Sequence, residues 1–145
     1  MMSLILFIHQ DSSKKGINLV NVINQNFNRI KLQTFHTFNA FKARLKKNSD
    51  FIDNEIFILL SESRTRLNQL TSLIDLLESK RTILILPDES KETLSKASQF
   101  FPRFFTPVSE TYTDLCDVLD KMINQEKKRS IKIIKPSSDF FNLLP

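Results

Sequence analysis

Four oxygen-bearing side chains stand where predicted strands of this chain end, and they are the residues best placed to do chemistry: Asp11, Ser61, Glu62 and Asp88. Each comes at or just after the end of a short apolar run, which is typical of a buried strand. If the strands are parallel, their carboxyl ends share one edge of a sheet, where α/β proteins bind ligands. Carboxylates there could hold a hard metal ion, and a serine hydroxyl could accept a transferred group.

The same residues have ordinary structural explanations. Asp11 can cap the helix after the first strand, and Asp88 can form a turn before the next helix. His9 could serve as a base for Ser61, because neighbouring parallel strands lie about 5 Å apart, but no third residue is evident to orient it. We therefore favour caps and turns over a rebuilt acidic pocket of Asp11, Glu62 and Asp88, and we do not expect Ser–His catalysis.

The composition excludes several kinds of site. The chain has 145 residues, and its only glycine is Gly16. Phosphate-binding loops of the Walker and dinucleotide types need several glycines, so those motifs are absent. His9, His36 and Cys116 show no zinc-ligand spacing. We expect neither a resident metal ion nor a cofactor.

Cysteine content and hydropathy indicate where the protein works. A single cysteine cannot form an internal disulfide, which fits a reducing compartment. No apolar run approaches the ~20 residues of a membrane span. The first ten residues lack a basic leader and a small-residue cleavage site, so we expect no signal peptide. These features favour the cytoplasm and no membrane contact.

Strand-like runs alternate with helix-like stripes five times. The strand-like runs cover 4–9, 29–35, 55–60, 82–86 and 103–107. The helical stripes are Ile17, Val20, Ile23 and Phe27; Phe38, Phe41 and Leu45; Leu67, Leu70, Ile74 and Leu77; Leu94, Ala97 and Phe101; and Leu115, Val118, Leu119 and Met122. Strands joined by helices lie parallel with right-handed crossovers, so this order predicts a three-layer α/β sandwich. The most apolar strands, the first, third and fourth, should be central.

The segment 127–145 has a different character from the rest of the chain. Five basic residues and one acidic residue lie from Lys127 onward, so this tail carries most of the net charge of +5. No aromatic residue stands among these charges, so we favour a helix end and a solvated linker over nucleic-acid binding. The stretch SIKIIK, 130–135, could add an extra strand. Four apolar residues then predict docking on this chain, on a sister chain or on another protein: Phe140, Phe141, Leu143 and Leu144.

Five strand–helix units of this length resemble the receiver domain of response regulators, the CheY-like family of the flavodoxin-like class. The resemblance covers about residues 3–126, so we divide the chain into a receiver-like domain at 1–126 and a tail at 127–145. It implies a five-stranded parallel sheet with helices on both faces. In receivers, an aspartate after the third strand accepts a phosphoryl group, and an acidic pair after the first strand holds magnesium. A Ser or Thr after the fourth strand, and a Lys before a proline after the fifth, contact the phosphoryl group.

The positions of this chain that match those places carry other residue types. His9 and Gln10 fall on the acidic pair with Asp11 one residue late, Ser61 on the aspartate, Pro87 near the Ser/Thr position, and Thr106 on the lysine before Pro107. A serine without an adjacent base is a weak nucleophile, and magnesium prefers carboxylate ligands. The resemblance therefore implies a pseudo-receiver that is not phosphorylated.

From this we expect a non-catalytic signalling or adaptor module with a protein partner, and a homodimer is an open option. By the same resemblance, the partner surface would cover 90–101, 103–107 and 113–123. One alternative is a ligand- or metal-binding enzyme or sensor that uses the acidic residues at the strand ends. The other is nucleic-acid binding through the basic tail, for which we see less support.

Overall fold

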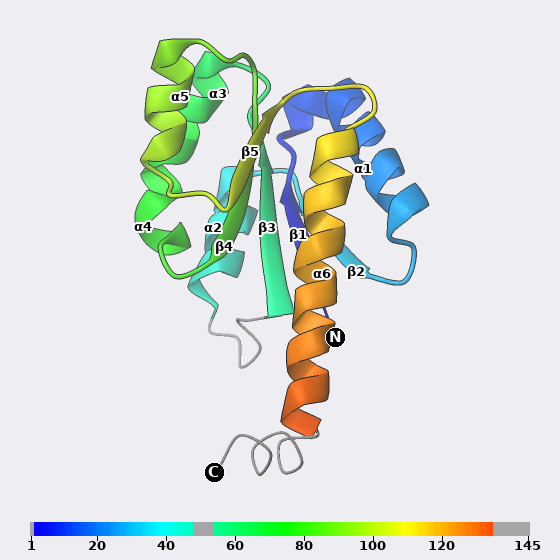
Figure 1. Cartoon of the computed structure of the whole chain (residues 1–145). Coiled ribbons are helices and arrows are strands. Elements are labelled where there is room, and N and C mark those ends of the chain that lie inside the picture. The colour runs from blue at the N-terminus through cyan, green and yellow to red at the C-terminus, as the bar shows by residue number, and fades with distance from the viewer. Residues whose placement is uncertain (1, 48–53, 135–145) are drawn as a thin grey trace.

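Five parallel strands form the centre of the protein, in the order β2-β1-β3-β4-β5 (Figure 1). The computed structural model describes residues 2–47 and 54–134, with side chains in the last helix described as far as Gln125. The strands are β1 Ser3–Phe7, β2 Lys31–Phe35, β3 Glu55–Leu60, β4 Arg81–Leu86 and β5 Phe104–Pro107. This order defines a flavodoxin-like α/β fold. It confirms the predicted fold class and the predicted central position of the first, third and fourth strands.

Helices cover both faces of the sheet, as Figure 1 shows. On one face lie α1 Ser13–Asn26, preceded by the 3-10 turn η1 Gln10–Ser12, and α6 Thr113–Ile134. On the other face lie α2 Phe38–Lys46, α3 Arg64–Leu70, η3 Thr71–Leu73, α4 Ile74–Leu77 and α5 Lys91–Ser98. The predicted third helix is thus interrupted by a short 3-10 turn.

The sheet separates two apolar cores because successive side chains of a strand point to opposite faces. Leu4 and Ile56 pack with α1 and α6 on one side. Ile5 and Phe57 pack with α2 to α5 on the other side. All six residues of β3 are buried, as expected of the middle strand of a parallel sheet.

Two predicted core residues are exposed. Ile17 is 61% exposed, and Leu19 is the buried residue of that turn because α1 presents Gly16, Leu19 and Ile23 to the sheet. Phe101 is 88% exposed, and Phe100 is buried instead. The helix α5 ends at Ser98, so helical spacing no longer governs where Phe101 points.

The predicted extra strand at the C-terminus is wrong for the residues that can be described. Ser130–Ile134 continue α6, which extends past the end of the sheet in Figure 1. No glycine or proline interrupts the sequence between Thr113 and Ile134, so nothing in it stops the helix. The predicted boundary at residue 126 falls inside this helix, and the rest of the tail, 135–145, lies outside the described residues. Within the described part of the chain, no helix is long and apolar enough to cross a membrane.

Gly16 is required for the close packing of α1 on the sheet. Its φ is not in the left-handed region, so conformational freedom is not the reason for a glycine. A Cβ built on Gly16 would lie 2.2 Å from Cγ2 of Ile8, a buried side chain that follows β1. Because Gly16 has no side chain, the start of α1 can pack directly on Ile8. Asp11 and Ser12, in the preceding turn η1, are held against the sheet with it.

We expect Gly16→Ala to destabilise the protein, although this change usually stabilises a helix interior. Overpacking against Ile8 costs about 1–3 kcal/mol and outweighs the helix-propensity gain of about 1 kcal/mol. Urea unfolding measures the difference. In an Ile8→Ala background the same glycine substitution should cost less, because the clashing methyl group is gone. An equal cost in both backgrounds would contradict this account.

Candidate functional site

Ser61 stands at the end of β3, in the position that the receiver resemblance assigns to the phosphoacceptor. It is fully buried. Its Oγ donates a hydrogen bond to the carbonyl oxygen of Ile85 at 2.5 Å, and its backbone N–H donates to the same oxygen at 2.9 Å. The hydroxyl is thus turned into the contact between β3 and β4. Both the hydroxyl and the backbone N–H of Ser61 therefore bond to the neighbouring strand β4.

His9 contacts the turn η1 and two phenylalanine rings. Its Nδ1 accepts a hydrogen bond from the backbone N–H of Asp11 at 3.1 Å, which caps the turn η1. Its ring packs edge-on against Phe7, with centroids 6.3 Å apart, and near Phe38 at 5.7 Å. His9 is therefore a capping and packing residue.

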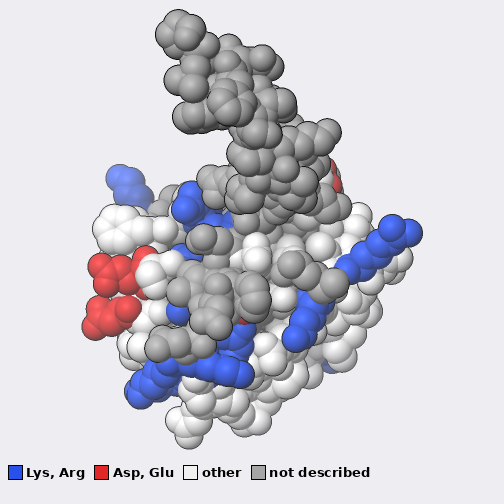
Figure 2. All heavy atoms as spheres, turned by 90° about the horizontal axis from the view of Figure 1, so that it is seen from below, with Lys and Arg blue, Asp and Glu red and all other residues white. Residues whose placement is uncertain are grey.

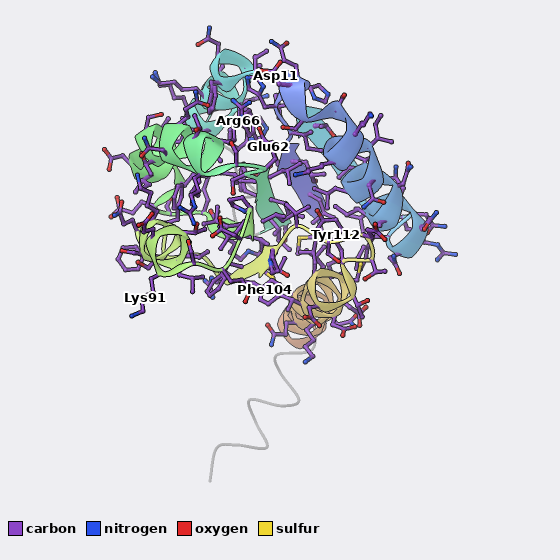
Figure 3. The ribbon with its side chains drawn as sticks, turned by 90° about the horizontal axis from the view of Figure 1, so that it is seen from above. Asp11, Glu62, Arg66, Lys91, Phe104 and Tyr112 are labelled. Atoms are coloured by element: carbon purple, nitrogen blue, oxygen red, sulfur yellow. The ribbon has the colours of Figure 1, made fainter. Side chains whose placement is uncertain are left out.

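Arg66 is the central residue of the sheet edge, and sequence reasoning did not single it out. Its Nε donates a hydrogen bond to Oε1 of Glu62 at 2.8 Å, and its Nη1 donates to Oε1 of Gln69 at 2.8 Å. Its Nη2 lies 3.8 Å from Oδ2 of Asp11. The guanidinium also lies over the ring of Phe38, with Cζ 5.9 Å from the centroid. Figure 3 shows Asp11, Glu62 and Arg66 gathered at this edge.

The start of α3 determines where Arg66 points. Ser63 is the N-cap, and its Oγ accepts a hydrogen bond from the backbone N–H of Arg66 at 3.0 Å. This cap places Arg66 one turn after Glu62, a spacing at which side chains of a helix meet. The spacing Glu-x-x-x-Arg is the sequence signal for this ion pair. It predicts the contact only once the helix is known to begin at Arg64.

The environment of Glu62 favours its charged form. Burial raises the pKa of this carboxyl, but hydrogen bonds from Arg66, from its own backbone and from Ser12, together with the charge of Arg66, hold it below its usual value. Ser12 Oγ and Glu62 Oε2 are buried without a hydrogen-bond partner of good geometry among the described residues. The Ser12 hydroxyl nevertheless lies near enough to Glu62 to contribute to the lowered pKa.

Asp88 is separate from the carboxylates around Arg66. Its Oδ1 accepts hydrogen bonds from Thr93 Oγ1 at 2.6 Å and from the backbone N–H of Ser90 at 2.9 Å. Its Oδ2 accepts from Nε of Arg64 at 3.1 Å. The hydrogen bond from Thr93, followed by those from Ser90, lowers the pKa of Asp88 well below its usual value. Asp88 thus forms the turn that leads into α5.

The structure therefore brings together two of the three carboxylates of the alternative pocket. Asp11 and Glu62 share Arg66, whereas Asp88 pairs with Arg64. The other positions matched to a receiver pocket also lie near the strand ends: exposed Gln10 in η1, half-buried Pro87 after β4, and buried Thr106 in β5. Phe140, Phe141, Leu143 and Leu144 lie outside the described residues.

Magnesium, which a receiver resemblance implies, does not fit this arrangement. No group of three or more His, Cys, Asp or Glu side chains is placed to hold a metal ion in residues 2–47 and 54–134. The two carboxylates that do converge already share a guanidinium group. A positive charge is thus supplied to this edge by the protein itself.

Comparisons with known proteins support the fold. No protein-family model matches the sequence, and no curated protein matches it. Among solved structures, a candidate pilus assembly-related protein from Burkholderia pseudomallei is similar with a TM-score of 0.58 and 19% identity, over 86% of this chain and 91% of that one. A candidate pilus assembly protein, CpaE, from Burkholderia thailandensis is similar with a TM-score of 0.58 and 18% identity, over 86% and 99%. The protein is thus an α/β domain of flavodoxin-like fold, with structural neighbours among candidate pilus assembly proteins.

The Glu62–Arg66 pair should make the protein sensitive to acid. Because the folded pKa of Glu62 is lowered, its contribution to stability is present above the unfolded pKa and is lost as pH falls through the folded value. We expect Glu62→Gln to be less stable than the wild type near neutral pH, and the difference to shrink as the pH falls below the ordinary carboxyl pKa of 4.5. Denaturant unfolding at a series of pH values measures it. Glu78→Gln, a change at an exposed carboxylate, is the control. A difference that is constant with pH would contradict the role of Glu62.

Proposed function

We propose that this chain is a non-catalytic signalling or adaptor module of the pseudo-receiver type, which acts through contacts with a protein partner. The observation that carries the proposal is Ser61. It stands where a receiver has its phosphoacceptor, yet its hydroxyl is fully buried and donates to the carbonyl of Ile85. The flavodoxin-like strand order is what allows Ser61 to be matched to the phosphoacceptor position of a receiver.

The chemistry around Ser61 supports the absence of phosphotransfer. A serine needs an adjacent base to become a strong nucleophile, and His9 Nδ1 is engaged with the backbone of Asp11. An incoming phosphoryl group needs a cation to balance its charge; Thr106 stands in the place of the receiver lysine, and Arg66 is already paired with Glu62 and Asp11. We infer that the sheet edge has a structural role and that no reaction occurs there.

The surface beside β5 is our candidate for the partner-binding site. Phe101 is 88% exposed and Phe105 is 47% exposed, so two large apolar side chains face solvent close together in the chain. Phe101 has a positive φ of 48°, a conformation that costs energy for this residue type and is often retained for function. The strand β5 also forms one edge of the sheet, in the region that the receiver resemblance assigns to partners. We call Phe101 and Phe105 the β5 patch.

Two further features guide the search for a partner. The structural neighbours are candidate pilus assembly proteins, so components of a pilus assembly apparatus are the first partners to test. The single cysteine supports a cytoplasmic location. A second copy of this chain remains a partner to test at the same patch.

Nucleic acid is the weaker alternative. Figure 2 views the end of the molecule where α6 leaves the sheet, and there the described Lys and Arg side chains lie in separate groups, whereas side chains from residue 126 onward lie outside the description. No aromatic residue stands among the five basic residues from Lys127 onward, whereas grooves that bind single-stranded nucleic acid combine charge with aromatic stacking. We therefore propose a protein partner.

The absence of phosphotransfer can be tested by mass. We expect the wild-type protein, incubated with a small-molecule phosphodonor and Mg²⁺, to keep its unmodified intact mass. A receiver with an intact site, treated in parallel, provides the positive control. One phosphoryl group per chain on this protein would contradict the central part of the proposal.

The β5 patch can be tested with matched surface variants. We expect Phe101→Ser with Phe105→Ser to abolish capture of a partner from nuclease-treated lysate, because an interface loses its apolar anchors. Ile17→Ser removes an exposed apolar side chain from α1 and should leave capture unchanged. Loss of capture in the Ile17 variant alone, or capture that depends on nucleic acid, would contradict partner binding at the β5 patch.

A further inference from the structure

Three oxygen-bearing side chains converge beside the end of β3. Asp11 and Ser12 belong to the turn η1, and Glu62 directly follows Ser61 at the end of β3. The Ser12 side chain is buried and its Oγ lacks a well-placed hydrogen-bond partner, as does Oε2 of Glu62. Two carboxylates and a hydroxyl are the hard oxygen ligands that Mg²⁺ and Mn²⁺ accept in proteins.

The cation present at this cluster is the Arg66 guanidinium. It is always charged, and only 10% of the side chain is exposed. It donates a hydrogen bond to Glu62 and lies 3.8 Å from Asp11. It also donates to Gln69 and lies over the ring of Phe38. The group is therefore fixed on several sides, unlike the mobile side chains of most surface ion pairs.

We propose that Arg66 is a built-in cation that replaces a divalent metal ion at the carboxyl end of the sheet. The guanidinium pairs with both carboxylates and joins η1 to α3, as a metal ion bound there would also do. Arg66 and a metal ion are mutually exclusive at this place. Removal of the guanidinium alone should therefore leave a site that binds a divalent cation.

The Glu62–Arg66 pair differs from an ordinary salt bridge on the surface of a helix. Glu62 and Arg66 are one turn apart, and such a pair on a surface contributes little and needs no third group. Here Glu62 and Arg66 are mostly buried, and Ser12 lies near Glu62. Asp11, from a distant part of the chain, is 73% exposed and lies 3.8 Å from Nη2 of Arg66. The inference depends on this geometry and not on whether the protein serves as an adaptor.

The test is the variant Arg66→Met, which keeps a long unbranched side chain and loses the charge. We expect Mn²⁺ and Mg²⁺ to raise its thermal unfolding midpoint, and calorimetry to detect Mn²⁺ binding about tenfold tighter or more than to the wild type. The wild-type midpoint should not respond, because Arg66 already occupies the place of the ion.

Two control variants separate this site from general charge effects. Arg64→Met removes the same charge two residues away, from a side chain that pairs with Asp88 and Glu92, and should gain no metal response. Arg66→Met combined with Glu62→Gln removes one carboxylate of the cluster and should lose the response that the single variant gains.

Each outcome of the experiment decides the inference. A folded Arg66→Met variant without a metal-dependent midpoint would overturn it, as would wild-type protein that binds Mn²⁺ equally well. If Arg66→Met is unfolded alone, refolding by Mn²⁺ supports the inference, and failure to refold contradicts it. Phosphorylation of the wild type would contradict the proposed function and leave this result unaffected.

Discussion

The ion pair between Glu62 and Arg66 is the interaction on which the polar edge of the sheet depends. Charges that are mostly buried are costly unless they are paired and hydrogen-bonded, so neither side chain can be lost alone without a large penalty. Gln69 and Phe38 add a hydrogen bond and an aromatic face to the guanidinium. The cap at Ser63 sets the helical register that lets the two side chains meet.

The carboxyl ends of parallel strands gather polar groups, and in this protein the main ones have structural partners. Ser61 donates to Ile85, and Asp88 accepts from the first turn of α5. Glu62 and Asp11 share Arg66, so polar side chains at the edge that is reactive in many α/β proteins are here ion-paired or hydrogen-bonded. Two of the large apolar side chains exposed in the described part of the chain, Phe101 and Phe105, lie just before the edge strand β5 and in it, and a third, Ile17, lies on α1. This arrangement is the physical basis of the proposed adaptor role.

Much of the fold follows from local sequence pattern, and less of the site does. Continuous apolar runs predict the central strands because a strand buried on both faces has no polar alternation to preserve. The contacts of Arg66 could not be predicted, because they depend on where α3 begins and on a turn more than fifty residues earlier. Ile17 and Phe101 were misplaced because a stripe of apolar residues does not fix the exact face or the last turn of a helix. The segment SIKII is apolar enough for a strand, but the uninterrupted helix before it determines its structure.

In our proposal, the Arg66 guanidinium permanently occupies the place of a metal ion near the buried Ser61. The most direct measurement is NMR of the wild-type protein, following the Arg66 Nε–H and the amides of Ser61 and Glu62 during titration with Mg²⁺ and a phosphoryl analogue. The account predicts a slowly exchanging Arg66 Nε–H, with none of these signals shifting when either ligand is added. Saturable shifts at Arg66 and Ser61 would show that the ion pair opens and that the site still receives a metal ion and a phosphoryl group, which would contradict the account.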